Sequence, residues 1–404
     1  MKRNLPFCLL IGLALAVILG VFLGVRARTL PQNEAGKAGT ASAHRPAAAS
    51  KPLRLAGGIL VPGNPIRFDI SWVDQARGRY YLAESGNAAV DVFDAENDLF
   101  IGRIGGFHGI PAADDPCGRI EGMGPNGVMV TPDNHLWADD AGGTVKVFDL
   151  SIATAPFRDV SPVATISTGA VCRADELGFD PKDHVVVVGN PEEHPPFAAI
   201  ISSDAPYDLL NKIPFPDATG FEQPLWDPDL KGGRMLVTVP GKDRDAKVAV
   251  LNLSNPKSAV VEKTYSTPGC GSGLALGPSQ HLLVGCGGGR PLIMIDATTG
   301  KTLATVEGSH GADEVWYNPA DNHFYAPSGN SAPPDLSVID AQTGKLITNL
   351  PAGPVAHSVS AYSRNNHVFV PIAAPTQAMP EDACNVLFGL PEKQGCIAVY
   401  APAK

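Results

Sequence analysis

Residues 313–353 read DEVWYNPADNHFYAPSGNSAPPDLSVIDAQTGKLITNLPAG, and this stretch decides the fold. It contains four short apolar runs, at residues 314–317, 323–326, 336–340 and 345–350. Gly, Pro, Asn, Asp and Ser fill the gaps between them, as in tight turns between β-strands. Similar units recur along the chain, and a four-strand repeat of about 40 residues is typical of a β-propeller blade.

The third run of this unit is the easiest to find elsewhere, because it is apolar and often ends in a polar residue before a turn. Its seven occurrences are residues 88–94, 144–150, 197–203, 247–253, 292–297, 336–341 and 396–401. The chain ends just after the seventh, whereas residues 53–61 precede the first blade without partners. We therefore predict an all-β, seven-bladed propeller that residues 53–61 close as the missing outer strand, which removes free sheet edges. Six or eight blades are the alternatives.

The formal net charge of -10 is unevenly distributed. Residues 1–52 hold seven Lys or Arg and one acidic residue, which leaves 24 basic and 40 acidic residues in the remainder. The excess of acidic residues in 53–404 argues against nucleic acid or an anionic membrane surface as a partner.

The N-terminus has the pattern of an export signal. Lys2 and Arg3 precede an uncharged, mostly apolar run at residues 5–25. The run is long enough to span a bilayer as an anchor. The equal alternative is a long signal peptide that is cleaved after Ala27 or Ala43. We predict a signal or anchor at 1–28, a flexible linker at 29–52 that is rich in Ala, Pro and Ser, and a propeller at 53–404. The propeller would be periplasmic, either free or anchored to the inner membrane, and we expect it to be a monomer.

Six of the seven cysteines follow the N-terminal run, which contains Cys8. An even number in an oxidising compartment predicts disulfides. Two of the six precede the first strands of adjacent blades, two bracket one hairpin, and two bracket the end of an insertion at residues 375–395. The predicted bridges are Cys117–Cys172, Cys270–Cys286 and Cys384–Cys396, and other pairings stay open.

Aligning the blades through the turn after their first strand gives a column of seven polar residues. They are Asp69, Asn126, Asp175, Glu222, Ser272, Asp313 and His357. The first strand of a blade is innermost, and its start lies at one mouth of the central channel. The column therefore predicts a polar ring around that mouth, which we call the polar ring.

Two segments, DLSVIDAQTGKLITNLPAG and LIMIDATTGKTLATVEG, resemble the repeats of YVTN-type β-propellers. This resemblance implies architecture and little about activity. More distantly, the blades are similar to those of gluconolactonase and senescence-marker lactonases. That family holds a divalent cation at the channel mouth through Glu, Asn and Asp side chains at the strand starts. The matching residues here are Asp69, Asn126, Asp175, Glu222 and Asp313.

One hypothesis is therefore a metal-dependent hydrolase of the lactonase or esterase type. A ring of oxygen ligands suits Ca²⁺ or Mg²⁺, which would polarise an ester carbonyl and activate a water molecule. Asp175 or Asp313 would be the general base, and His357 or His310 a second proton-transfer group. The alternative is a polar channel that holds only ordered water.

The other hypothesis is a binding or scaffold protein without catalysis. Ser272 lies in GCGSG, but no helix follows it as a nucleophile elbow requires, and no other nucleophile motif is present. Long loops on a rigid scaffold often carry function, and residues 105–126 and 375–395 provide them. A protein or a small molecule would bind on this loop face.

Overall fold

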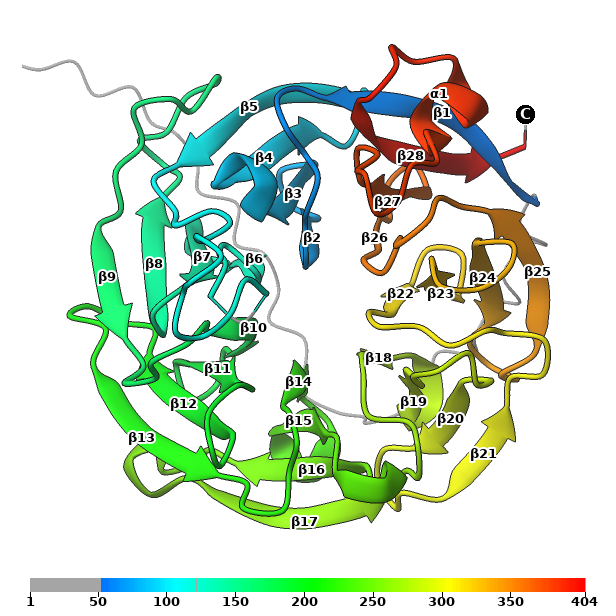
Figure 1. The fold of residues 1–404 in the computed structure, drawn as a ribbon. Coiled ribbons are helices and arrows are strands. Elements are labelled where there is room, and N and C mark those ends of the chain that lie inside the picture. The colour runs from blue at the N-terminus through cyan, green and yellow to red at the C-terminus, as the bar shows by residue number, and fades with distance from the viewer. Residues whose placement is uncertain (1–51, 121, 404) are drawn as a thin grey trace, which may run out of the picture. The chain divides into compact units, whose positions relative to one another are not determined.

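The computed structural model describes residues 52–403 except residue 121, and the stretch at 313–353 forms the sixth of seven four-stranded antiparallel sheets (Figure 1). Its strands are β22 (Trp316–Asn318), β23 (His323–Ser328), β24 (Asp335–Asp340) and β25 (Leu346–Pro351). The all-β, seven-bladed propeller is thus confirmed. The predicted N-terminal apolar helix, signal or anchor, and linker lie outside the described residues.

In each blade, the first strand lines the central channel and the second strand lies directly behind it (Figure 1). The other innermost strands are β2 (Ser71–Asp74), β6 (Val128–Val130), β10 (Asp175–Asp180), β14 (Glu222–Asp227), β18 (Leu274–Leu276) and β26 (Ser360–Tyr362). The other second strands are β3 (Arg79–Glu84), β7 (His135–Asp140), β11 (Val185–Asn190), β15 (Arg234–Val239), β19 (His281–Val284) and β27 (His367–Ile372).

The third and fourth strands complete each blade toward the outside. The other third strands are β4 (Ala89–Asp94), β8 (Thr144–Asp149), β12 (Phe197–Ser202), β16 (Lys247–Asn252), β20 (Ile293–Asp296) and β28 (Gly395–Pro402). The other outer strands are β1 (Leu53–Val61), β5 (Leu99–Gly105), β9 (Ala164–Ser167), β13 (Leu209–Pro214), β17 (Val260–Ser266) and β21 (Thr302–Thr305). All seven third strands begin within one residue of the predicted runs.

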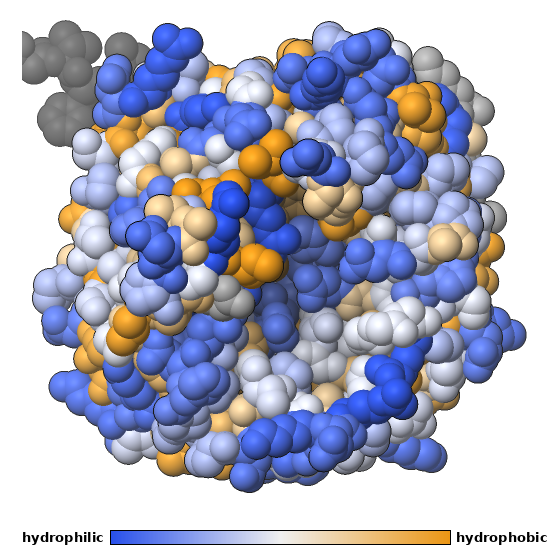
Figure 2. All heavy atoms as spheres, in the orientation of Figure 1, coloured by the Kyte–Doolittle hydropathy of each residue, from blue (hydrophilic) through white to orange (hydrophobic). Residues whose placement is uncertain are grey.

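Strand β1 closes the ring as predicted. It pairs antiparallel with β28, from Leu53 opposite Pro402 to Val61 opposite Gly395. The first and last strands of the propeller are therefore neighbours in the seventh blade (Figure 1). Figure 2 shows a hollow at the centre of one face of the ring, with hydrophilic side chains around it.

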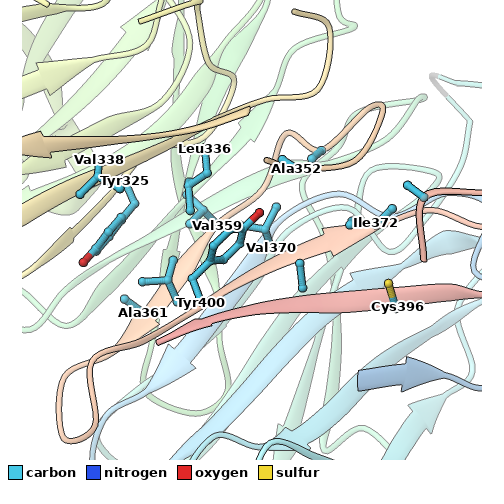
Figure 3. Close-up of a cluster of buried hydrophobic side chains, with 14 of the residues drawn as sticks. Tyr325, Leu336, Val338, Ala352, Val359, Ala361, Val370, Ile372, Cys396 and Tyr400 are labelled. Atoms are coloured by element: carbon cyan, nitrogen blue, oxygen red, sulfur yellow. The ribbon is translucent and has the colours of Figure 1, made fainter. Parts of the chain in front are cut away.

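The core lies between neighbouring blades, because each sheet is covered on both faces. A strand in that position needs apolar residues on both sides, and all six residues of β11 are buried. Figure 3 shows the cluster between the sixth and seventh blades, where Tyr325 and Tyr400 are fully buried. The Tyr400 hydroxyl donates a hydrogen bond of 2.6 Å to the Pro351 carbonyl, which joins these two blades. Each large apolar side chain buried here contributes about 1.5–3 kcal/mol.

The insertion of the seventh blade contains a short helix, α1 (Ala383–Phe388), that the sequence did not predict. The Asp382 carboxylate caps it by accepting from the Asn385 amide, and Gly389 ends it with a positive φ. Single 3₁₀ turns occur at Ser85–Asn87, Leu230–Gly232, Lys242–Arg244, Pro256–Ser258 and Pro278–Gln280. Within the described range, the helices are all too short or too polar to cross a membrane.

The three disulfides join Cys117 to Cys172, Cys270 to Cys286, and Cys384 to Cys396. This is the pairing predicted from the positions of the cysteines in the blades. Cys8 lies outside the described residues.

Candidate functional site

The polar ring occupies the starts of the innermost strands. Asp175 and Glu222 are the first residues of β10 and β14, and the other five ring residues precede their strands by two or three positions. The predicted column is therefore a real structural equivalence, and it brings side chains from different blades to the same end of the channel.

Arg173 connects the ring across blades. Its guanidinium lies 3.2 Å from Asp69 Oδ2, 3.0 Å from Asp175 Oδ2 and 3.3 Å from Glu192 Oε1. Asp69 belongs to the first blade and Asp175 to the third, so Arg173 bridges past the second blade. There, the Asn126 side-chain amide donates to the carbonyls of Met123 and Ala174. Arg173 thus supplies positive charge to two ring aspartates that the sequence assigned to a metal.

His357 is held by acceptors at both ring nitrogens. Nδ1 lies 2.6 Å from the Val355 carbonyl and Nε2 lies 3.3 Å from Asp69 Oδ1. An imidazole that donates from both nitrogens is the protonated imidazolium. Burial lowers the pKa of His357, but the hydrogen bond to Asp69 and the charges of Asp69 and Asp313 outweigh it and raise that pKa above its usual value. The ring also stacks on Phe68 at 5.0 Å between centroids.

Asp69 is the strongly ionised member of the ring. Burial opposes its ionisation, but the hydrogen bond from His357 and the charges of Arg67 and Arg173 lower its pKa to about 2. Its Oδ1 faces His357 and its Oδ2 faces Arg173. Both oxygens of Asp69 therefore already have positively charged partners.

The four ring carboxyls outnumber the three cations near them, which are Arg67, Arg173 and His357. Burial, opposed by Arg173 and reinforced by Asp69 and Asp313, raises the pKa of Asp175 to about 7. Burial and the charges of Asp313 and Asp175 raise the pKa of Glu222 well above its usual range. Asp313 is accessible to solvent within the channel, yet the protein surrounds it closely enough to raise its pKa as well. At neutral pH the ring therefore holds protons as well as negative charge.

The donor set was tested against the predicted divalent cation. Two of the five predicted ligands face Arg173, and no group of three or more His, Cys, Asp or Glu side chains in residues 52–403, residue 121 aside, is arranged to hold a metal ion. An ion at Asp69 and Asp175 would compete with the guanidinium for the same oxygens. The metal site, and the catalytic roles of Asp175, Asp313 and His357, stay predictions, and we derive no reaction step through them.

A cavity of about 310 Å³ lies beside the ring, on the loops of the fifth, sixth and seventh blades. Its walls are residues 286–289, 310–313, 327–330 and 355–357, together with Arg67 and Ser272. Ser272, Asp313 and His357 thus bring three ring positions to one hollow. We call it the loop-face cavity.

The loops of the cavity are held by covalent and polar contacts. Cys286, which is in the wall, is bonded to Cys270. His310 Nδ1 lies 2.7 Å from Asp335 Oδ2, and the Ser328 hydroxyl donates to the His310 carbonyl at 2.7 Å. Gly329 donates its amide to Ala356 at 2.7 Å, which fixes the sixth-blade loop to the seventh. The cavity therefore has walls that are formed before any ligand arrives.

Sequence reasoning missed Arg67 and Arg173. Each stands two residues before a ring aspartate, in RFD at 67–69 and RAD at 173–175. This shared spacing is the signal that would have placed both arginines beside the ring. It would not have shown which partner each one meets.

No protein-family model and no curated protein matches the chain. Among solved structures, one chain in the crystal structure of a mitotic checkpoint complex is similar, with a TM-score of 0.57 and 14% sequence identity. The match covers 95% of this chain and 100% of that chain. At so low an identity the similarity establishes the propeller fold alone. The resemblance of the hairpins to YVTN-type repeats stays a prediction.

Proposed function

We propose that this protein is a binding protein that takes a small polar ligand in the loop-face cavity. The observation that carries the proposal is the cavity itself. Its volume of about 310 Å³ is at the lower end of the range for small-molecule sites. Glycine backbone and the side chains of Arg67, Asp313 and His357 line it, so it offers several hydrogen-bonding groups at fixed positions.

The state of the ring favours binding over catalysis. Asp175 is ion-paired with Arg173, and His357 is engaged at both nitrogens. These contacts hold the channel mouth in shape. A metal-dependent hydrolase of the lactonase type, with its cation at the channel mouth, remains the alternative proposal.

A protein partner on the same face is a second candidate for binding. The similar propeller is a chain of a multiprotein complex, so this fold can work within a protein assembly. From the N-terminal sequence we also propose that the protein is exported, and from the hairpins of the fifth and sixth blades that its repeats are of the YVTN type. An oxidising compartment agrees with the three disulfides.

The experiment that tests this proposal introduces a large side chain at the wall of the cavity. Gly287 is in its wall, and a Cβ at this position meets no atom within 4 Å, so we expect Gly287→Tyr to add a bulky ring at the cavity wall without a clash at Cβ. Gly105→Tyr is the matched control, because Gly105 has the same open space but lies on the outer strand β5. Neutral sugars, amino acids and small organic acids are screened by thermal shift and confirmed by calorimetry.

We expect at least one compound to bind, Gly287→Tyr to abolish that binding and Gly105→Tyr to retain it. The proposal is wrong if none of the compounds binds, or if binding survives in Gly287→Tyr.

A further inference from the structure

We infer that the ligand of the loop-face cavity carries a carboxylate, which pairs with Arg67, and a hydrogen-bond donor such as a hydroxyl or ammonium group, which meets Asp313. This inference rests on the proposed binding function and adds the chemical class of the ligand. It starts from two charged side chains in the wall of one cavity that have no charged partner among the described residues.

Arg67 is the first of these side chains. It makes no ion pair and no side-chain hydrogen bond with the described residues, and its Nε is buried without a partner. A buried donor without an acceptor costs about 1–3 kcal/mol, so such groups are rare unless something else satisfies them. A planar guanidinium is well matched to a carboxylate, which accepts two parallel hydrogen bonds from it.

Arg173 shows that the lack of a partner is specific to Arg67. Both arginines precede a ring aspartate by two residues, in RFD and RAD. Arg173 contacts three carboxylates, and these include Asp69, the aspartate that follows Arg67. Asp69 makes its contacts with Arg173 and His357, and the charge of Arg67 acts on it without a contact among the described residues. The guanidinium of Arg67 is left at the cavity wall.

Asp313 is the second of these side chains. It also lines the cavity, is accessible to solvent, and makes no ion pair within residues 52–403 as described. Burial raises the pKa of Asp313, and the charge of Arg67 is one of the smaller effects that oppose this rise, so the two side chains are near enough to influence each other without forming a contact. A ligand with an anionic group at one end and a donor at the other would satisfy both.

The other charges of the cavity are already compensated. His310 is hydrogen-bonded to Asp335, and His357 to Asp69. One carboxylate of the ligand would therefore balance the charge of Arg67, whereas a second would lie opposite the carboxylate of Asp313 and be repelled by it. The cavity thus favours hydroxy- or amino-monocarboxylates over dicarboxylates and over neutral molecules.

The probes are lactate, 3-hydroxybutyrate, gluconate, L-serine and L-threonine, each beside its primary amide, titrated into the full-length protein by calorimetry. We expect at least one carboxylate to bind, and its amide to bind at least tenfold more weakly. A hydrogen bond to a charged group is worth about 1.5–3 kcal/mol, which corresponds to roughly tenfold to a hundredfold in affinity.

Arg67→Gln should weaken binding of the carboxylate to the level of the amide, and Arg67→Lys should restore part of it. Neither variant should lower the melting temperature (Tm) of the free protein, because Arg67 has no described ion pair to lose. Asp313→Asn should weaken the binding of L-serine more than that of lactate, since an ammonium group depends more on the carboxylate charge than a hydroxyl does.

The inference is overturned if no carboxylate binds, if an amide binds as tightly as its acid, or if Arg67→Gln leaves the affinity unchanged. Equal competition by inorganic phosphate would overturn the carboxylate assignment in favour of a general anion site. The comparison of acid and amide uses the unmodified protein, so it stands even if Arg67→Gln does not fold. A different outcome would overturn this inference alone and support the proposed binding function. In that outcome a neutral sugar binds to the unmodified protein and to Arg67→Gln, but not to Gly287→Tyr.

Discussion

Arg173 contacts ring carboxylates of two different blades, and 104 residues separate it from Asp69. Its side chain is largely buried, with 13% exposed, and the two aspartates that it contacts are more buried still. The guanidinium therefore neutralises buried negative charge at the channel mouth, together with His357, which pairs with the other oxygen of Asp69. We expect the stability of this mouth to depend strongly on Arg173.

Arg173→Gln should lower the free energy of unfolding by about 3–5 kcal/mol, the usual cost of removing one partner from a buried ion pair. Arg364→Gln is the matched control, because the Arg364–Glu96 pair is exposed and such pairs contribute about 0–1 kcal/mol. Thermal denaturation followed by circular dichroism measures both. Equal melting temperatures for the two variants would show that Arg173 is not a structural counterion.

At the level of single residues, the sequence predicted the position of each ring member but not its partner. The position depends on local spacing within a blade, which repeats and can be aligned. The partner depends on how blades are rotated about the channel, and only the folded ring brings Asp69 of the first blade to Arg173 of the third. For this reason the sequence does not distinguish Arg67, which has no ion pair among the described residues, from Arg173, which has three.

Among the elements, the turns between third and fourth strands explain the repeated Asp and Gly. In the sixth blade, Asp340 Oδ1 accepts from the Thr343 amide at 2.8 Å and from its hydroxyl at 2.7 Å. The Gly344 amide then donates to the Asp340 carbonyl at 2.8 Å, and Gly344 has a φ of 66°. The fifth blade repeats this arrangement with Asp296 and Gly300. The Asp–Thr–Gly motif that these two blades share is thus a turn-forming unit.

Gly344→Ala should destabilise the protein by about 1–2 kcal/mol, because a left-handed backbone is unfavourable for a residue with a Cβ. The added Cβ would also lie 2.9 Å from the Cβ of Ala304. In a protein of this length, each kcal/mol of lost stability lowers Tm by about 2–4 °C or by less. Gly105→Ala is the control, since its Cβ would be in open space, and its Tm should stay close to that of the unmodified protein. An unchanged Tm for Gly344→Ala would contradict this account of the turn.

The strands were predictable and α1 was not, for reasons of length and context. Strands can be recognised in the sequence as apolar runs bounded by turn residues, and each blade repeats this pattern. Helix α1 has six residues, too few to show a helical period, and isolated helices of that length are unstable in water. Its Cys384–Cys396 bond and the burial of Ala383 and Cys384 against the seventh blade stabilise it.

Over the whole molecule, the ring carboxyls predict how stability depends on pH. Carboxyls such as Asp175 and Glu222, whose folded-state pKa is raised, stabilise the fold fully below pH 4 and lose this contribution as pH rises through the folded value. The raised pKa of His357 acts in the same direction above about pH 6.5. The lowered pKa of Asp69 adds stability that is lost only as pH falls from about 4 toward 2.

The melting temperature should therefore be higher at pH 5 than at pH 8. Asp175 alone, with a folded-state pKa of about 7, contributes up to about 1.4 kcal/mol per pH unit across the window below that value. Scanning calorimetry at a series of pH values measures the trend, and Glu222→Gln should reduce its slope. A Tm that rises from pH 5 to pH 8 would rule out this picture of the ring.

Closure of the ring by β1 makes a second prediction at this scale. Deleting residues 53–61 removes the outer strand of the seventh blade and exposes the edge of β28, while Ile59 and Val61 are lost from the core. Each buried side chain contributes about 1.5–3 kcal/mol, so Tm should fall by about 10 °C or more. Deleting residues 29–50, the predicted linker, should leave Tm nearly unchanged. Equal effects of the two deletions would count against closure by β1.

The pairing of β1 with β28 also sets the order of events when the protein is made. The first propeller strand leaves the ribosome long before its partner, whose paired residues are 395–402. Six blades have all four of their strands earlier, since each of those sheets is built from consecutive segments. The seventh sheet therefore waits for β28 to be synthesised, and until then β1 has no strand to pair with. A chain that stops before β28 cannot close its ring.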